Sequence, residues 1–414
     1  MLVENKEQCS ACAACYNICP KNAVELASDE FGYVYPLINK DKCIGCNLCE
    51  KVCPFKNIVK KFCPIKTYAA VYNSPDIINS TSGGAFKFLA DRILESGGSV
   101  YGASMEASMD GSFRVKHKRA ISEEGLLCIR GSKYVQSDMD SIYQNVRDDL
   151  EEGKAVLFSG TPCQVAGMRS YFKDKYENLF LIDIICHGVP NLKLFNDYIR
   201  YYESKHNLKV VDFCFRDKKR GTRPLAKITF TKGKHKKQKY IPYDFSSYYM
   251  LFMKGYIYRE SCYNCKFACP ERVGDITIGD CWGLSVENAG LLKENGGPFV
   301  EKSGISCVLC NTPKGQNLFE SCSNRAIFKE IPYEYILAHN GQLNHPSIKP
   351  DAYDELLNDY SLKGYDGVEM FYKNKFPNSM LYKAYWKEIS MDLVRQIIPS
   401  KVRKMVKNLV IRKT

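Results

Sequence analysis

The sequence predicts an α+β/α/β protein in three parts: a cysteine-rich module over residues 1–63, an α/β domain over residues 64–345 and a mostly helical, basic extension over residues 346–414. Eight cysteines of the first part fall in two nearly identical runs, which indicates a small ligand-stabilised module. Beyond residue 64, strand-like and helix-like segments alternate, which is typical of α/β domains. At 414 residues and 45% hydrophobic content, the chain is long enough for about two to three separate cores.

The module contains the runs CSACAACYNICP, starting at Cys9, and CIGCNLCEKVCP, starting at Cys43. Each has the spacing C-x2-C-x2-C-x3-C-P, in which three thiolates hold one cubane and the fourth reaches the neighbouring one. Zinc usually takes two separated C-x2-C pairs, so the uninterrupted runs favour iron and sulfur. Because the ligands cross in such pairs, the first [4Fe-4S] cluster is assigned to Cys9, Cys12, Cys15 and Cys53, and the second to Cys43, Cys46, Cys49 and Cys19. Residues 1 to about 60 resemble a bacterial-type two-cluster ferredoxin domain.

The chain contains 20 cysteines, and their tight C-x2-C spacing favours metal binding over disulfides. No stretch approaches the roughly 20 apolar residues that span a bilayer, and a cysteine motif begins too early for a cleavable leader. We therefore expect a cytoplasmic protein.

The net charge of +13 lies almost entirely beyond the module, which has eight lysines and seven acidic residues. No nucleic-acid-binding module is recognisable, and the basic residues are not interleaved with stacking aromatics, so no nucleic-acid partner is expected. Acidic proteins, phosphate-bearing cofactors or an anionic membrane surface fit the charge better.

The second part is expected to form a largely parallel sheet, because buried strands alternate with helices along it. Ser80, Thr81 and Ser82 are candidate caps of the first helix, and Gly97 ends it. The expected strands are 67–73, 154–160 and 179–186, and the expected helices are 80–98, 161–172 and 191–205.

Two of these helix starts have the composition of phosphate sites. Ser82, Gly83 and Gly84 let the backbone approach a ligand at a helix N-terminus, where free N–H groups favour an anion. The alternative is that the three residues only cap a helix. Gly160 and Thr161 open a second helix, which suits any α/β protein.

The motifs TSGGAF, GSKYVQS, FSGTPCQVAG, DIICHGVP, SCYNCKF and DITIGDCWG follow the module in this order. Together they resemble the coenzyme F420 hydrogenase/dehydrogenase beta-subunit family, over residues 1 to about 345, and look most like its members associated with bacterial polysaccharide synthesis. The resemblance implies an FAD-binding α/β domain and electron transfer between iron-sulfur clusters and flavin. It makes the following residues candidates for the flavin pocket: Ser82, Gly83, Gly84, Lys133, Gln136, Ser137, Gly160, Thr161 and Gln164.

The resemblance also implies an additional [4Fe-4S] cluster, with Cys163, Cys186, Cys262 and Cys265 as its candidate ligands. Cys269 or Cys281 could substitute, since CYNCKFACP ends like a ferredoxin run. Cys128 and Cys214 are lone cysteines, which more often serve as small buried apolar residues.

His187 follows a strand end, where α/β enzymes often place functional groups, and is the candidate proton donor or acceptor. A histidine bonded to a loop carbonyl is the equally plausible structural alternative. Asp280 and Trp282 could pack against a flavin, although Trp282 is expected to finish a strand and turn.

Two basic segments suggest partners. Residues 216–239 carry eleven Lys/Arg and one acid in an expected hairpin, which indicates either a docking face for ferredoxin or another acidic redox protein, or a lysine-protected sheet edge. Residues 393–414 carry seven Lys/Arg and no acid, which permits peripheral membrane contact, although a helix packed on the body is favoured.

The sequence therefore predicts an iron-sulfur flavoprotein oxidoreductase acting on an unidentified small organic substrate. The competing hypothesis is an electron-transfer adapter subunit for a separate hydrogenase, dehydrogenase or reductase, including one that uses coenzyme F420. FAD beside a deep substrate pocket would favour the enzyme, and a flat basic face would favour the adapter.

Overall fold

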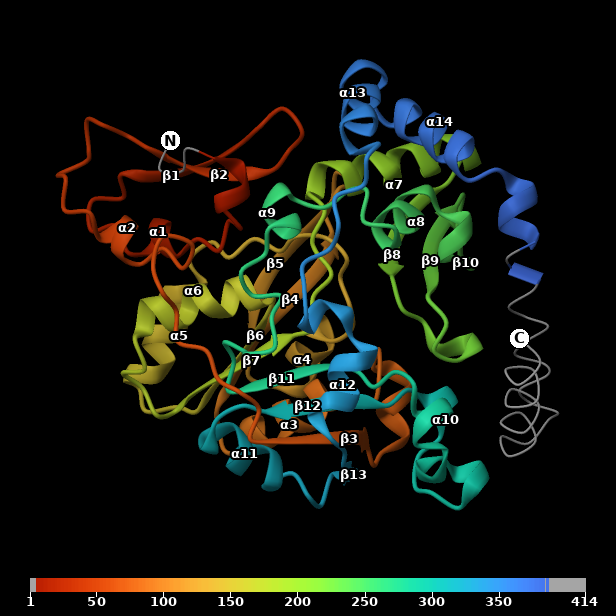
Figure 1. The fold of residues 1–414 in the computed structure, drawn as a ribbon. Coiled ribbons are helices and arrows are strands. Elements are labelled where there is room, and N and C mark those ends of the chain that lie inside the picture. The colour runs from red at the N-terminus through yellow and green to blue at the C-terminus, as the bar shows by residue number, and fades with distance from the viewer. Residues whose placement is uncertain (1–4, 384, 387–414) are drawn as a thin grey trace.

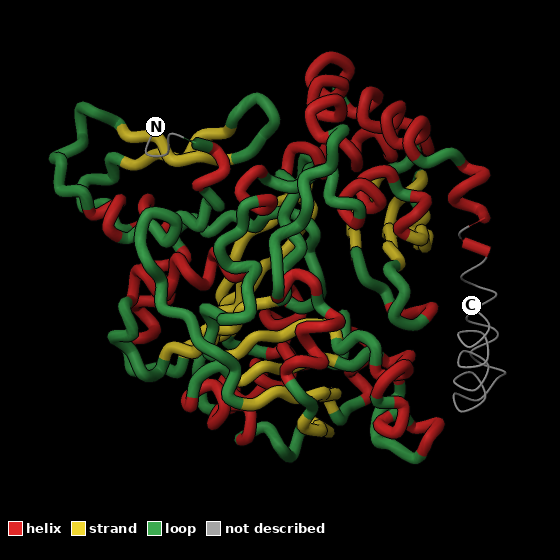
Figure 2. Tube along the Cα trace, viewed as in Figure 1, coloured by secondary structure: helices red, strands yellow, loops and turns green. Residues whose placement is uncertain are grey.

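The computed structural model describes residues 5–383, 385 and 386 (Figure 1). A central sheet with helices on both faces forms the body, and the cysteine-rich module lies at one side of it (Figures 1 and 2). In the described part of the chain, no helix is long and apolar enough to cross a membrane.

The module is built around a small antiparallel hairpin of β1 (Val24–Ser28) and β2 (Val34–Ile38). Two single-turn helices, α1 (Ala14–Asn17) and α2 (Leu48–Lys51), carry parts of the two cysteine runs. The repeated sequence pattern of the two runs therefore corresponds to a repeated local structure.

The central sheet has eight strands in the order β13-β3-β12-β11-β7-β6-β4-β5. Only β4 with β6, β6 with β7 and β7 with β11 pair in parallel, and the other four pairings are antiparallel. The expectation of a largely parallel sheet is thus wrong, because strands that add at both edges reverse direction. The strands are β3 (Lys66–Tyr72), β4 (Ser99–Ala107), β5 (Phe113–Ala120), β6 (Val156–Gly160), β7 (Leu179–Ile184), β11 (Ile276–Asp280), β12 (Ser306–Cys310) and β13 (Ala326–Glu330).

Helices cover both faces of this sheet because its strands are apolar on both sides. One face packs against α3 (Ala85–Glu95), α4 (Glu123–Ile129) and α11 (Pro313–Glu320). The other packs against α5 (Ile142–Glu151) and α6 (Pro162–Phe172) at one end, and against α10 (Leu284–Glu287) and α12 (Tyr333–His339) at the other. This layering leaves the carboxyl ends of the parallel strands as the edge open to a site.

The first helix of the body begins later than its sequence predicts. α3 starts at Ala85, and its N-cap is Gly84, with φ of 84° and no side-chain cap bond. Ser80, Thr81 and Ser82 precede this point and do not cap the helix; the Ser82 hydroxyl donates to the carbonyl of Ile305 instead. The helix ends as expected, with Gly97 in the left-handed region.

A second lobe packs on the body and has an aromatic core. Its three-stranded sheet runs β10-β9-β8. The predicted basic hairpin is its β9–β10 pair, and α13 and α14 belong to the extension, whose residues 393–414 lie outside the described residues. The lobe contains α7 (Leu192–His206), β8 (Lys209–Cys214), β9 (Leu225–Lys232), β10 (His235–Pro242), α8 (Ser247–Met253), α9 (Glu260–Tyr263), α13 (Tyr353–Lys363) and α14 (Tyr365–Lys375).

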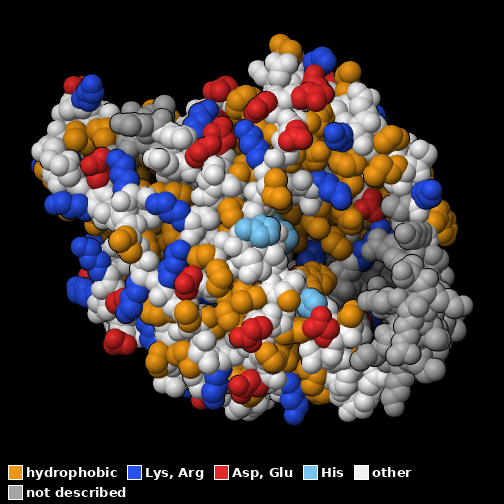
Figure 3. Space-filling view, viewed as in Figure 1, with side chains coloured by type: hydrophobic (Ala, Val, Ile, Leu, Met, Phe, Trp, Pro, Cys, Tyr) orange, Lys and Arg blue, Asp and Glu red, His pale blue; other side chains and the backbone are white. Residues whose placement is uncertain are grey.

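The hairpin and the module lie on opposite sides of the molecule (Figure 1). On the face in Figure 3, lysines and arginines gather along the edge below the module, whereas the upper lobe carries both signs of charge. A partner that meets the module would therefore not meet the β9–β10 hairpin at the same time.

Candidate functional site

The two cysteine runs share one backbone feature. Ala13 before α1 and Asn47 before α2 are both left-handed, with φ of 61° and 56°. Non-glycine residues seldom adopt this conformation, so the surrounding loop must impose it. In both runs the loop curls before the helix begins, as a loop that surrounds a ligand does.

The first quartet consists of Cys9, Cys12, Cys15 and Cys53, which lie on the side of the module that faces the body. Burial raises the pKa of the Cys15 thiol to about 12, and repulsion from Cys9 and Cys53 adds to the rise. Burial also raises the pKa of Cys12, with further repulsion from Cys15 and Cys53. The last cysteine of the second run thus lies among three cysteines of the first, which is the crossed arrangement that the spacing predicts.

The second quartet lies at the outer end of the module. Cys19, Cys43, Cys46 and Cys49 line one cavity of about 130 Å³. Cys43 and Cys46 are exposed, in contrast to the buried Cys9 and Cys12. The two quartets therefore differ in their distance from solvent.

The third quartet comes from three distant parts of the chain. Cys163 is in the first turn of α6, Cys186 follows β7, and Cys262 and Cys265 belong to α9 and the loop after it. All four line a single cavity. Burial raises the pKa of Cys262 to about 12 and that of Cys265 to about 11. Burial also raises the pKa of Cys186, and repulsion from Cys262 and Cys265 adds to this rise. Bound metal would offset this, because it stabilises the thiolate form.

The two substitute ligands lie elsewhere. The Cys269 sulfur accepts from the Lys61 ammonium at 3.1 Å, and Cys281 is buried in the apolar cluster beneath α12. Neither residue lines the cavity of the third quartet. The structure therefore favours Cys163 as the fourth member.

In the described residues, no group of three or more His, Cys, Asp or Glu side chains converges on one metal ion. A cubane does not require such convergence, because each of its four irons takes a single thiolate.

The first and third quartets are neighbours. Ser10 and Phe55 of the module line the same cavity as Cys186 and Cys262. From the body, the Tyr143 hydroxyl donates to the Cys12 carbonyl at 2.7 Å. The first quartet therefore lies between the exposed outer quartet and the third, and it contains the two most deeply buried of these cysteines, Cys9 and Cys12.

Two buried arginines that the sequence analysis missed flank the third quartet. Arg259 is 0% exposed and donates to the carbonyls of Cys9 and Val34. Arg272 pairs with Asp183 at 3.3 Å, and their side chains are 1% and 0% exposed. An Asp inside the apolar strand LFLIDIIC was the one sequence signal for this pair, since buried carboxylates need partners.

His187 lies at the mouth of the same cavity. Its ring is solvent-accessible but stands in a recess, where desolvation lowers its pKa, Asp280 opposes this effect and Arg216 adds to it. Its carbonyl accepts from Ser347 at 2.6 Å. An imidazole that is kept neutral at this position can accept a proton and, once protonated, return it.

Asp280 and Trp282 of the DITIGDCWG motif have different surroundings. Asp280 ends β11 and forms an ion pair with the half-buried Arg216 at 3.1 Å. Trp282 follows it with 44% of its surface exposed, as a residue in a turn after the strand.

Three segments that the sequence singled out lie in a row at the carboxyl edge of the sheet. The Ser132 amide donates to Thr81 at 3.0 Å, which joins GSKYVQS to the loop before α3. At the other end of that segment, Gln164 donates to the Ser137 hydroxyl at 3.0 Å. Gln164 also accepts from the Thr161 amide next to Gly160, so the row continues to the third quartet.

Several of these side chains interact with other protein groups. Gln136 donates to the carbonyl of Ser10 at 2.9 Å and thereby joins the body to the module. Ser137 contacts His117 at 3.0 Å, a buried histidine that sequence reasoning missed and whose pKa burial lowers to about 4. Thr161 contacts the Cys163 sulfur at 3.2 Å.

Two lysines beside this row have little negative charge near them to stabilise their charged forms. Burial lowers the pKa of Lys133 to about 7 and that of Lys218 to about 8. Lys133 donates to the carbonyl of Arg130, and Lys218 donates to three carbonyls, among them that of Ser82. In the part of the chain that the structure describes, neither forms an ion pair, so a bound anion would stabilise both charged forms.

Gly83 is fixed by packing. A Cβ atom there would lie 2.3 Å from the carbonyl oxygen of Ala70 and 2.4 Å from the amide nitrogen of Ser306. The backbones of β3 and β12 thus occupy the space beside Gly83 in which the sequence suggested a ligand.

Replacing Gly83 with alanine is expected to lower the free energy of unfolding by about 1–3 kcal/mol, because the new methyl group overlaps two backbones. Urea denaturation of the full chain measures the change. Gly290→Ala is the matched control, since nothing lies within 4 Å of a Cβ there. Equal stabilities of the two variants would contradict the packing role.

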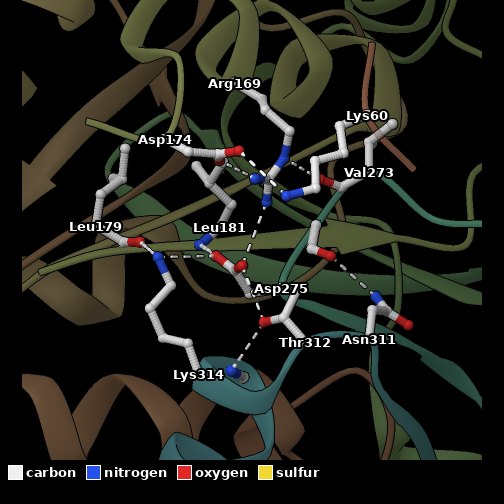
Figure 4. Close-up of polar contacts among 12 residues, drawn as sticks. Lys60, Arg169, Asp174, Leu179, Leu181, Val273, Asp275, Asn311, Thr312 and Lys314 are labelled. Carbon is white, nitrogen blue, oxygen red and sulfur yellow. Dashed lines mark hydrogen bonds and ion pairs between the residues drawn. The ribbon is translucent and has the colours of Figure 1, made fainter. Parts of the chain in front are cut away.

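The α6 helix that carries Cys163 is anchored by a buried polar network (Figure 4). Arg169 of α6 contacts Asp275 at 3.3 Å and donates to the Val273 carbonyl at 2.7 Å. Asp275 also accepts from Thr312 and from the Leu181 amide. The network ties the helix to the central strands and to the segment that follows the third quartet's loop.

Comparison with known proteins agrees with this architecture. Residues 3–61 match the model of the 4Fe-4S dicluster domain. Residues 153–334 match the model of the C-terminal part of the coenzyme F420 hydrogenase/dehydrogenase beta subunit. A dicluster module on a mixed α/β body defines an iron-sulfur protein of the electron-transfer class. Residues 153–334 are thus similar to the coenzyme F420 hydrogenase/dehydrogenase beta-subunit family that the motifs predict.

A solved structure entitled "Xenon derivatization of the F420-reducing [NiFe] hydrogenase complex from Methanosarcina barkeri" is also similar, with 16% identity and a TM-score of 0.41. The match spans 76% of this chain and 92% of that one. No curated protein matches the sequence.

Proposed function

We propose that the protein is an iron-sulfur flavoprotein oxidoreductase that passes electrons between [4Fe-4S] clusters and FAD to reduce or oxidise a small organic substrate. The observation that carries this proposal is the order of the three thiol quartets, from the exposed Cys43 and Cys46 to the recess at His187. We propose a division into residues 1–63, 64–345 and 346–414 for the module, the body and the extension.

The cofactor assignment follows from the donor sets. The quartets would hold three [4Fe-4S] clusters, which transfer single electrons. The uncompensated Lys133 and Lys218 fit the pyrophosphate of FAD, which supplies the conversion between one-electron and two-electron chemistry. Gly84, without a side-chain cap, leaves the start of α3 to an anion. Among the nine predicted flavin residues, Gln136 and Gln164 would act by holding the pocket's walls together.

His187 is the proposed proton donor or acceptor. It stands at the mouth of the cavity of the third quartet, and desolvation favours its neutral form. A neutral imidazole can take a proton from a substrate or return one to it at neutral pH. The half-buried ion pair Arg216–Asp280 beside it would hold its surroundings fixed.

The alternative function is an electron-transfer adapter subunit for a partner hydrogenase, dehydrogenase or reductase, including use of coenzyme F420. The family is named for a beta subunit, which favours protein partners. Ferredoxin or another acidic redox protein would meet the positive edge beside the module rather than the distant β9–β10 hairpin. The resemblance suggests a role in polysaccharide biosynthesis, with the organic substrate unidentified. Residues 393–414 are the candidate for peripheral membrane contact.

Anaerobic purification followed by iron, sulfide and flavin analysis tests the proposed cofactors. We expect about twelve irons and one flavin per chain, from three cubanes and one FAD. A colourless protein without flavin would contradict both the enzyme and the flavin-containing adapter.

FAD affinity is expected to weaken as the pH rises from about 6 to 9. Lys133 and Lys218 are charged below their pKa values of about 7 and 8 and neutral above them, and only the charged forms attract a pyrophosphate. The affinity should fall by at most about tenfold per pH unit for each lysine. Fluorescence titration of the deflavinated full chain with FAD measures it.

Lys133→Met should flatten part of this profile, and riboflavin, which lacks phosphate, should bind with little dependence on pH. An FAD affinity that stays constant across this range would exclude the two lysines from the phosphate site.

A further inference from the structure

Arg259 is a buried cation without a carboxylate partner in the described part of the chain. Its side chain is 0% exposed, and its hydrogen-bond acceptors are the carbonyls of Cys9 and Val34, at 2.5 and 2.7 Å, and the amide oxygen of Gln136 at 3.3 Å. The guanidinium also lies over the Tyr35 ring at 4.2 Å. All these partners are neutral, so the full positive charge remains in a low-dielectric setting.

The position of this charge is specific. Arg259 contacts the backbone of Cys9 in the first quartet and precedes Cys262 of the third by three residues, while it lines the cavity of the third quartet. Its charge favours the thiolate forms of both Cys9 and Cys262. The exposed Cys43 and Cys46 lie at the far end of the module, where solvent screens charges.

Arg272, the other buried arginine of this cavity, differs in one respect. Its charge is neutralised by Asp183 at 3.3 Å. Of the two guanidinium groups that flank the third quartet, only that of Arg259 therefore presents a net charge to its surroundings.

We propose that Arg259 is a positioning and tuning residue that raises the reduction potentials of the first and third clusters together, so that electrons move inward from the outer one. The inference rests on the proposed clusters. Addition of one electron makes each thiolate-ligated cluster one charge more negative, and a nearby uncompensated cation stabilises this reduced form more than the oxidised form. The electron comes from a low-potential one-electron donor.

The test is an EPR-monitored redox titration of the anaerobic full-length holoprotein. Arg259→Gln should lower the potentials of the two inner clusters by at least about 59 mV, a tenfold change for one electron. Arg259→Lys, which keeps the charge, should restore most of the native values. The outer cluster should keep its potential in both variants, and Cys46→Ser identifies its signal.

A second variant adds the opposing charge and keeps the arginine. Gln136→Glu places a carboxylate at the atom that accepts from Arg259, so it should lower the same two potentials even if Arg259→Gln fails to fold. Arg200→Gln is the control, since Arg200 is an exposed residue of α7 that pairs with Asp197.

Three results would overturn the proposal: unchanged inner potentials, equal shifts in the Lys and Gln variants, or equal shifts of all three clusters. Absence of the clusters from the native protein would instead contradict the proposed function, and iron analysis before the titration separates the two failures.

Discussion

Replacing Cys262 and Cys265 together with serine is expected to lower the iron content from roughly twelve to roughly eight atoms per chain, because one cubane of three is lost. Both residues line the cavity that they share with Cys163 and Cys186, and burial raises the pKa of each thiol. With two of four ligands removed, the remaining thiols cannot hold a cubane. Iron and sulfide analysis of anaerobically reconstituted full-length protein measures the loss.

The matched control is the double variant Cys269→Ser with Cys281→Ser. These cysteines belong to the same stretch of sequence but lie outside the cavity, so their replacement should leave the iron content unchanged. A native protein with eight irons, or equal losses in both double variants, would rule out this ligand set.

Asp275→Asn is expected to lower the free energy of unfolding by about 1.5–3 kcal/mol, because buried Arg169 keeps only the more exposed Asp174 as a counter-charge and loses a charged hydrogen-bond partner. Asp275 and Arg169 have side chains that are 4% and 6% exposed, and Lys314 approaches the same carboxylate at 3.7 Å (Figure 4). The Leu181 amide and the Thr312 hydroxyl donate to it as well. Chemical denaturation of the reconstituted protein, followed by circular dichroism, gives the difference.

Asp354→Asn is the control for this variant. Asp354 pairs with Lys349 at 3.3 Å, but the two side chains are 82% and 44% exposed, and such surface pairs contribute less than about 1 kcal/mol. If both variants lost the same small amount of stability, the network of Figure 4 would not anchor α6.

The local elements of the body were predictable where pattern and turn residues agree. The strand before Thr161 and the helix that follows it occur as expected, because an apolar run is followed by a capping residue and Pro162 at the first helical position. The cap of α3 was missed because Gly84 stops the chain in a left-handed conformation that several preceding serines do not reveal. The direction of the edge strands was missed too, since strand pairing depends on partners far along the chain.

The residues of the candidate site also divide into those that the sequence predicted and those that only the folded structure reveals. Spacing alone brought together the cysteines of each run, whereas the third quartet depended on a family resemblance, because Cys163 and Cys262 are far apart in sequence. Arg259 carried no sequence signal at all. Its role as an unpaired charge follows only from what it lacks nearby after folding.

The sequence by itself determined that this protein binds iron and sulfur, since four thiolates at fixed short spacing can close around a cubane whatever the rest of the chain does. Its local motifs also predicted the similarity of residues 153–334 to the beta-subunit family. Only the tertiary structure decided the place of the first quartet between the other two, and the lack of an ion-pair partner among the described residues for Arg259, Lys133 and Lys218. Burial and electrostatic environment are sums over neighbours from the whole chain, so no local stretch of residues specifies them.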